Sequence, residues 1–112
     1  MVFIGADGGG TKTVLVACDE TGNLLGKAEC PGVNYNAIGK DAARENLKQG
    51  VDRLLSDIGA SAYECLCVGL SALDEPASYE ETLSFAGGAF DPDKLLLLSD
   101  AYVALAGATG FA

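Results

Sequence analysis

The sequence contains no histidine and no Cys-x-x-Cys pair, two of the commonest signatures of a protein metal site. Its four cysteines are Cys18, Cys30, Cys65 and Cys67, and each lies in an apolar, strand-like segment. A thiol in such a segment usually acts as a small hydrophobic side chain. Cys65 and Cys67 alternate at the period of a strand, so both should point to one face of a sheet. We therefore expect core thiols rather than metal ligands.

Basic side chains are scarce, with seven lysines and arginines against sixteen aspartates and glutamates and a formal net charge of −9. A field of this sign repels nucleic-acid backbones and anionic membranes. No run of eighteen or more apolar residues is present, and residues 1–6 are too short for a signal peptide. The sequence thus predicts a cytoplasmic protein with no nucleic-acid or membrane partner, and it leaves a homodimer open.

Prolines are also few, at three, while 49% of the 112 residues are hydrophobic and 21% are charged. This composition excludes a disordered chain and predicts a folded one. The length suits one small domain, which we place at residues 1–112.

Apolar periodicity predicts strands and helices in the order β-β-β-α-β-α-β-α. In this scheme Asp41 is the N-cap of the first helix, Gly59 ends it, and residues 31–39 before it form a loop. The strands are expected at residues 2–7, 13–18, 24–30, 63–70 and 95–99, and the helices at residues 41–58, 78–86 and 100–108.

This order predicts an α/β fold in which an antiparallel meander is followed by strands that helical crossovers make parallel. The first, fourth and fifth strands should therefore end on one edge of a mixed sheet. Ligands bind at such an edge in open α/β sheets. The three ends carry Asp7, Ser71 and Asp100.

The most informative segment is Asp7-Gly8-Gly9-Gly10-Thr11-Lys12. Successive glycines let backbone N–H groups converge on an anion, while Thr11 adds a hydroxyl donor and Lys12 a positive charge. Asp7 is placed to hold Mg²⁺ through water beside a bound phosphate. An unliganded hairpin turn would need only one glycine, so the run favours a phosphate site. A Walker loop is excluded because a strand, not a helix, follows.

Strand–Asp-Gly-Gly-Gly-Thr-Lys–strand resembles the first phosphate motif of the acetate kinase, hexokinase, Hsp70 and actin superfamily. Within it, the chain is most similar to N-acetylglucosamine kinases and to the BadF/BadG/BcrA/BcrD-type activator ATPases of acyl-CoA reductases and dehydratases. The resemblance implies a ribonuclease H-like lobe with a five-stranded mixed sheet, ATP and Mg²⁺ as cofactors, and a second lobe that carries the rest of the nucleotide site.

Two further residues gain a role from the resemblance. Asp100 closes the fifth expected strand and opens a helix. Its position alone suits a helix cap as well as a general base, and the resemblance implies the base that accepts the proton of a sugar hydroxyl. Asn34 lies in an Asn-Tyr-Asn loop that could be a simple turn, and the resemblance implies a contact with the sugar.

Four functions remain open at this level. The first is an ATP-dependent kinase that acts on an amino sugar such as N-acetylglucosamine, and the second is an activator ATPase that drives electron transfer through an iron–sulfur cluster. A ribonuclease H-like nuclease and a non-catalytic binding lobe are the others. Because the resemblance places half of the phosphate contacts in a second lobe after Ala112, we expect negligible kinase activity from these 112 residues alone.

Overall fold

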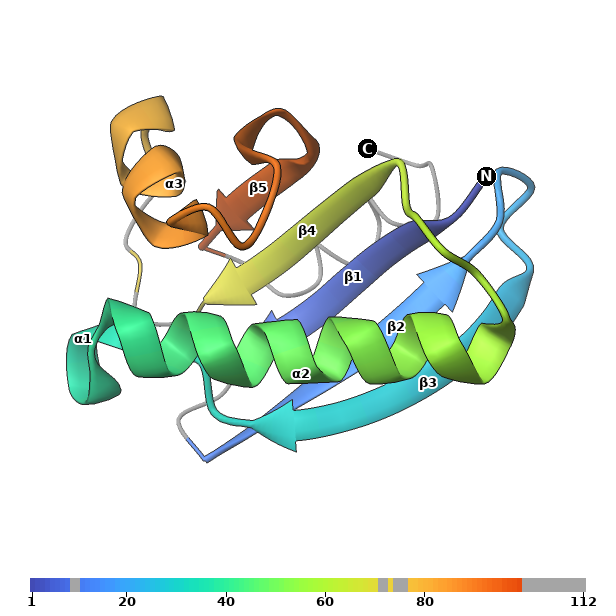
Figure 1. The fold of residues 1–112 in the computed structure, drawn as a ribbon, viewed down its shortest axis with the longest axis horizontal. Helices are drawn as coiled ribbons and strands as arrows, with labels where there is room; N and C mark the ends of the chain where they lie inside the picture. Colours follow the sequence, from blue (N-terminus) through green and yellow to red (C-terminus); the bar gives the residue numbers. More distant parts are fainter. Residues whose placement is uncertain (9–10, 71–72, 74–76, 100–112) are drawn as a thin grey trace.

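The computed structural model describes residues 1–8, 11–70, 73 and 77–99. Figure 1 shows their arrangement as one sheet with helices packed against it. The elements are β1 (Phe3–Gly8), β2 (Lys12–Cys18), β3 (Leu24–Pro31), α1 (Tyr35–Ile38), α2 (Lys40–Ile58), β4 (Cys65–Leu70), α3 (Tyr79–Ala86), the 3₁₀ turn η1 (Pro92–Lys94) and β5 (Leu95–Leu98).

The described strands form a five-stranded sheet in the order β3-β2-β1-β4-β5. β1, β2 and β3 pair antiparallel as a meander, whereas β4 is parallel to β1 and β5 is parallel to β4. The predicted mixed sheet is therefore confirmed. The pairing of β2 with β3 is irregular beside Gly26, because Leu25 is skipped in the register. The helix expected at residues 100–108 lies outside the described residues.

Four of these strands end at the same edge of the sheet. Asp7 of β1 pairs with Gly69 of β4, and Gly69 pairs with Leu98 of β5, so the three ends are level. β3 is antiparallel to β2 and so runs in the direction of β1. In Figure 1 the arrowheads of β1, β3, β4 and β5 point to the left, towards α1. The edge predicted to bind ligand is thus present, and β3 adds the loop that follows it.

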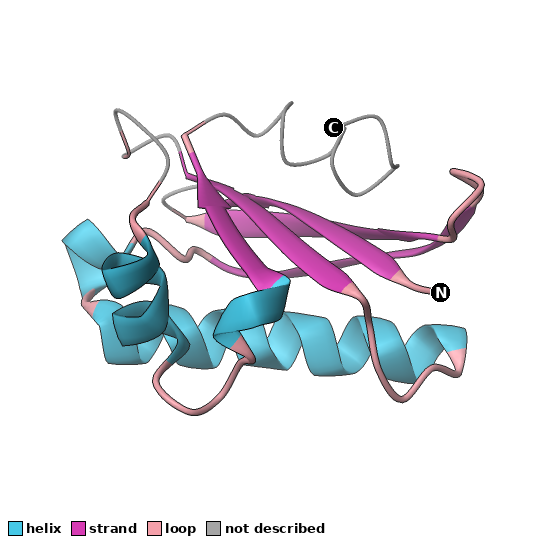
Figure 2. Ribbon diagram, turned by 90° about the horizontal axis from the view of Figure 1, so that it is seen from above, coloured by secondary structure: helices cyan, strands magenta, loops and turns pink. Residues whose placement is uncertain are grey.

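All described helices lie on one face of the sheet, as Figure 2 shows. The long helix α2 contributes the buried residues Ala43, Leu47, Gly50, Val51 and Leu54 to the core. Burying each leucine side chain fully contributes roughly 1.5–3 kcal/mol, so this face accounts for much of the docking energy of the helix. No helix in the described part of the chain is both long enough and apolar enough to cross a membrane.

Gly50 lets α2 approach β2 and β3 closely. A Cβ atom at this position would lie 2.9 Å from both Cys30 Sγ and Leu15 Cδ1. Real Cβ atoms almost never make contacts that short, so any other residue would push the helix away from the sheet. The contact sets how closely the middle of α2 packs against β2 and β3.

The start of α2 differs from the prediction. Helix α2 begins at Lys40, with Gly39 as its N-cap residue, so the assignment of Asp41 as N-cap is wrong. The cause is α1, a short helix inside the segment predicted as loop, which brings helical structure up to Gly39. Asp41 instead lies in the first turn of α2 and forms an ion pair of 2.9 Å with Arg44. The predicted C-terminal stop is confirmed, since Gly59 has a left-handed φ of 71°.

The turn between β2 and β3 is organised by Asp19. Its Oδ1 atom accepts hydrogen bonds from the hydroxyl of Thr21 at 2.7 Å and from the backbone N–H of Asn23 at 3.0 Å. These bonds, that of Thr21 first, hold the pKa of Asp19 at about 2, below its ordinary value of 3.8. A carboxylate that is hydrogen-bonded in its charged form gives this turn its shape.

We expect the Asp19→Asn variant to have a lower free energy of unfolding than the wild type at pH 5, and we expect this difference to be smaller at pH 2. The folded pKa is depressed, so the contribution of Asp19 is present above pH 3.8 and disappears as the pH falls towards 2. Urea unfolding of both proteins at pH 5, 3 and 2 measures the difference. A difference that is constant over this range would contradict the assignment.

Candidate functional site

The bend after β1 begins at Gly8, which is buried between the end of β4 and the segment that follows β3. A Cβ atom here would lie 2.7 Å from Leu70 Cδ2, 2.8 Å from Val33 Cγ2 and 3.0 Å from the carbonyl oxygen of Gly69. A glycine is therefore required at this position for packing, before any ligand is considered. This close packing also holds the backbone N–H group of Gly8 against β4 and the loop after β3.

Asp7 precedes this bend and is exposed. Its neighbours Ala6 and Gly8 are buried, with Ala6 in the core on the helix face, so the alternation of the strand directs Asp7 to the face away from the helices. Its partner on β4 is Gly69, which has no side chain to fill the space beside the carboxylate. An exposed carboxylate next to a backbone bend fits the oxygen ligands and retained waters that Mg²⁺ prefers.

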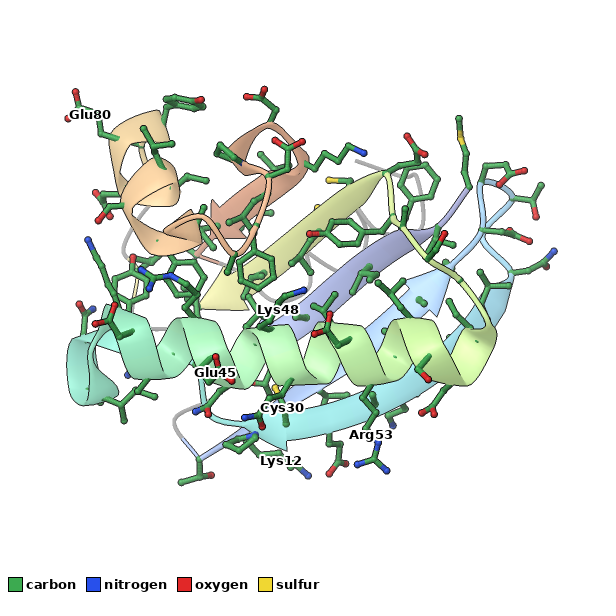
Figure 3. The ribbon with its side chains drawn as sticks, viewed as in Figure 1. Lys12, Cys30, Glu45, Lys48, Arg53 and Glu80 are labelled. Atoms are coloured by element: carbon green, nitrogen blue, oxygen red, sulfur yellow. The ribbon has the colours of Figure 1, made fainter. Side chains whose placement is uncertain are left out.

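Thr11 and Lys12 complete the described part of the motif, and both are exposed. Lys12 Nζ lies 3.6 Å from Glu29 Oε1, with side-chain exposures of 59% and 55%. An ion pair this exposed contributes about 0–1 kcal/mol, so a phosphate can compete for the ammonium group. Figure 3 shows Lys12 beside the end of β3, at the edge where the strands terminate.

The segment after β3 lies against the glycine bend through Val33, which is fully buried. The next residue, Asn34, caps α1: its Oδ1 atom accepts the backbone N–H of Asn36 at 3.1 Å. This bond uses the amide oxygen of Asn34 and fixes the orientation of its side chain. Asn34 is therefore held close to the glycine bend in space, 26 residues after Gly8 in the sequence.

Tyr35 anchors this loop, a role that its place in a polar sequence did not indicate. Its ring lies 5.5 Å from that of Phe85 in α3, and Lys40 Nζ lies 5.8 Å from its centroid. Burial, followed by the nearby charge of Glu81, raises the pKa of the Tyr35 hydroxyl. An aromatic residue between two asparagines was the only signal in the sequence, and its partner lies 50 residues away.

Arg44 lies on α2, the helix that follows this loop, and it links α2 to α3. Its Nε atom donates to the carbonyl of Phe85 at 2.6 Å and its Nη2 atom to the carbonyl of Ser84 at 3.1 Å. These carbonyls belong to the last turn of α3 and would otherwise lack an intrahelical partner. The contact holds α3 in place behind Tyr35.

The structure thus brings together Asp7, Gly8, Thr11, Lys12 and Asn34 at one edge of the sheet. The other predicted site residues, Gly9, Gly10 and Asp100, lie outside the described residues. β5 ends at Leu98, level with Asp7 and two strands away, a separation of about 10 Å at normal strand spacing. The chain therefore leaves β5 from the same edge that carries the glycine motif.

Known proteins share this sequence and fold. Residues 4–110 match the BadF/BadG/BcrA/BcrD ATPase family. An N-acetyl-D-glucosamine kinase of Dictyostelium discoideum is 32% identical over 82 aligned residues, which cover 65% of this chain and 26% of the relative. A solved structure from Chromobacterium violaceum, assigned as an N-acetylglucosamine kinase, superposes with a TM-score of 0.64 at 24% identity and covers 99% of this chain and 39% of that chain.

The structural likeness confirms the predicted fold class, an α/β lobe of the actin-like ATPase type with a five-stranded mixed sheet. The chain spans well under half the length of both relatives. The match over residues 4–110 confirms the predicted family. The chain belongs to the BadF/BadG/BcrA/BcrD ATPase family.

Proposed function

We propose that this chain forms the first lobe of an ATP-dependent kinase that phosphorylates an amino sugar such as N-acetylglucosamine. The observation that carries the proposal is the packing of Gly8 at the level strand ends, with exposed Asp7 and Lys12 beside it. In this proposal the backbone N–H groups of residues 8–10, the Thr11 hydroxyl and the Lys12 ammonium group bind the phosphates of ATP. Asp7 holds Mg²⁺ through water.

The chemistry requires charge stabilisation and a proton acceptor. Bound Mg²⁺ neutralises charge that develops on the phosphate oxygens. Amide donors fixed by the fold stabilise the same charge without having to reorganise. Asp100 takes the proton from the attacking sugar hydroxyl, a step that contributes roughly 10²–10⁴-fold. Asn34 contacts the sugar through the Nδ2 group that its capping bond leaves available.

The two relatives support the proposed sugar substrate and the proposed need for a second lobe. The Dictyostelium relative is an N-acetyl-D-glucosamine kinase, and this chain covers 26% of it. A site built by this lobe alone holds only one side of the nucleotide, so donor and acceptor are not oriented for transfer. We therefore propose that residues 1–112 by themselves have negligible kinase activity.

Transfer of labelled phosphate from [γ-³²P]ATP to N-acetylglucosamine tests both parts of the proposal. A protein that carries both lobes should produce the sugar phosphate in the presence of Mg²⁺, and the 112-residue chain should give no turnover above the rate without enzyme. Turnover by the chain alone would refute its inactivity. ATP hydrolysis without transfer, together with bound iron and sulfide, would refute the kinase and favour an activator ATPase.

A further inference from the structure

Cys65 and Cys67 bring two thiols together on β4. Their Sγ atoms lie 3.5 Å apart and share a hydrogen bond in which either can donate. The intervening Leu66 is fully buried in the core that α2 covers, so both cysteines point to the opposite face of the sheet. On that face their partners on β1 are Phe3 and Gly5.

The other two cysteines differ from this pair. Cys30 Sγ lies against the backbone of Gly50 beneath α2, and Figure 3 shows Cys30 under that helix. Burial raises the pKa of the thiols of Cys18 and Cys30. By contrast, Cys65 is only partly buried, and its hydrogen bond with Cys67 lowers the pKa of Cys65 and raises that of Cys67. Only the Cys65–Cys67 pair combines an accessible sulfur with a second sulfur in contact.

The backbone makes this pair a poor disulfide. Residues two apart on a strand have Cα atoms about 6.6–6.8 Å apart, the upper limit for a disulfide, whose sulfur atoms must come to about 2.05 Å. β4 is paired with β1 at Cys65 and with both β1 and β5 at Cys67. The strand therefore cannot contract to close the bond without breaking its pairing.

The same spacing suits a bridging metal ion. Two thiolates bound at about 2.3 Å to a tetrahedral Zn²⁺ lie about 3.8 Å apart. The observed 3.5 Å is within a few tenths of an ångström of that value, and a small side-chain rotation accounts for the difference. Among the described residues no group of three or more histidine, cysteine, aspartate or glutamate side chains is placed to hold a metal, so this part of the chain offers the ion no third ligand beside the two sulfurs.

We propose that Cys65 and Cys67 form a two-thiolate site for a soft divalent cation such as Zn²⁺ or Cd²⁺. Water or a small thiol completes the tetrahedron, and the thiol protons still present are released to solvent. Thiolates select soft ions and carboxylates select Mg²⁺, so this site is chemically separate from that of Asp7. The proposal revises the expectation that all four cysteines are inert core thiols, since three are buried and Cys65 is not.

Titration of the purified protein with Cd²⁺, followed by the ultraviolet sulfur-to-cadmium charge-transfer band, tests this site. We expect saturation at one ion per chain, undiminished by a large excess of Mg²⁺. Cys65→Ser and Cys67→Ser should each weaken Cd²⁺ binding at least tenfold. Cys18→Ala is the matched control and should bind as the wild type does. Full binding by Cys65→Ser, or equal loss in the control, would overturn the proposal.

A second measurement needs no variant and covers the case in which Cys67→Ser fails to fold. The wild-type protein is alkylated with iodoacetamide, with and without Cd²⁺, and the modified peptides are identified by mass spectrometry. Bound Cd²⁺ should slow the alkylation of Cys65 at least tenfold and leave the rates at the buried Cys18 and Cys30 unchanged. Unchanged alkylation of Cys65 at saturating Cd²⁺ would count against the site.

Discussion

Asp7→Asn is expected to lower kcat/KM for phosphate transfer by the two-lobed protein by about 10²–10³-fold, the cost of removing one preorganised charge from such a site. The amide keeps the shape of the carboxylate and removes the charge that holds Mg²⁺ in the proposed site. Because Asp7 is exposed, its replacement should leave the free energy of unfolding unchanged. The loss should therefore appear in catalysis alone.

Steady-state kinetics at several Mg²⁺ concentrations measure this effect. Asp57→Asn is the matched control, since Asp57 is an exposed aspartate on α2 and its replacement removes the same charge. The Asp7 variant should need more Mg²⁺ for half-maximal rate, and the control should not. A change of less than threefold in the Asp7 variant would exclude Asp7 from the metal site.

Gly8→Ala is expected to destabilise the fold by about 1–3 kcal/mol, the usual cost of overpacking. The added methyl group would lie within 3.0 Å of the carbonyl oxygen of Gly69, and that backbone is held in the sheet by β1 and β5. The contacts with Leu70 and Val33 are shorter still, and both side chains are buried. The bend must therefore move, so nucleotide binding should be lost together with stability.

Urea unfolding and nucleotide binding by calorimetry check this prediction. Thr11→Ala is the control, because Thr11 belongs to the same turn but is exposed. Its unfolding free energy should match that of the wild type, while its affinity for nucleotide falls modestly. If the Gly8→Ala variant had the same free energy of unfolding as the wild type, the close packing around this glycine would not be what positions the bend.

Much of the fold was predictable because its signals are local. Strand alternation, as in the buried Leu15 and Ala17 of β2, is set by the sequence of each segment, and so is the left-handed stop at Gly59. The start of α2 was mispredicted because aspartate is a common N-cap residue. In the structure the chain before Asp41 is already helical at α1, and Gly39 is the N-cap of α2. A four-residue helix has too little periodicity to be distinguished from a loop.

The site was predictable only where it is contiguous. Asp7, Gly8 and Lys12 lie in one motif, and a strand, a bend and a strand are enough to bring them together. The contact of Val33 with Gly8 and that of Tyr35 with Phe85 join segments far apart in the sequence, so they depend on how the helices pack on the sheet. The 3.5 Å between Cys65 and Cys67 depends on side-chain rotamers, which a two-residue spacing does not specify.

The most direct test is to follow the backbone amides of ¹⁵N-labelled protein by NMR during titration with Mg²⁺–ATP. The turn at residues 19–23 is an internal reference, because it is also a glycine-containing hairpin turn but is closed by Asp19 and lies at the opposite edge of the sheet. The phosphate-site account predicts that the largest shift changes occur at residues 7–12, with smaller changes at residues 33–36 and none at the reference turn. Unchanged amides at residues 7–12 under saturating nucleotide would contradict it.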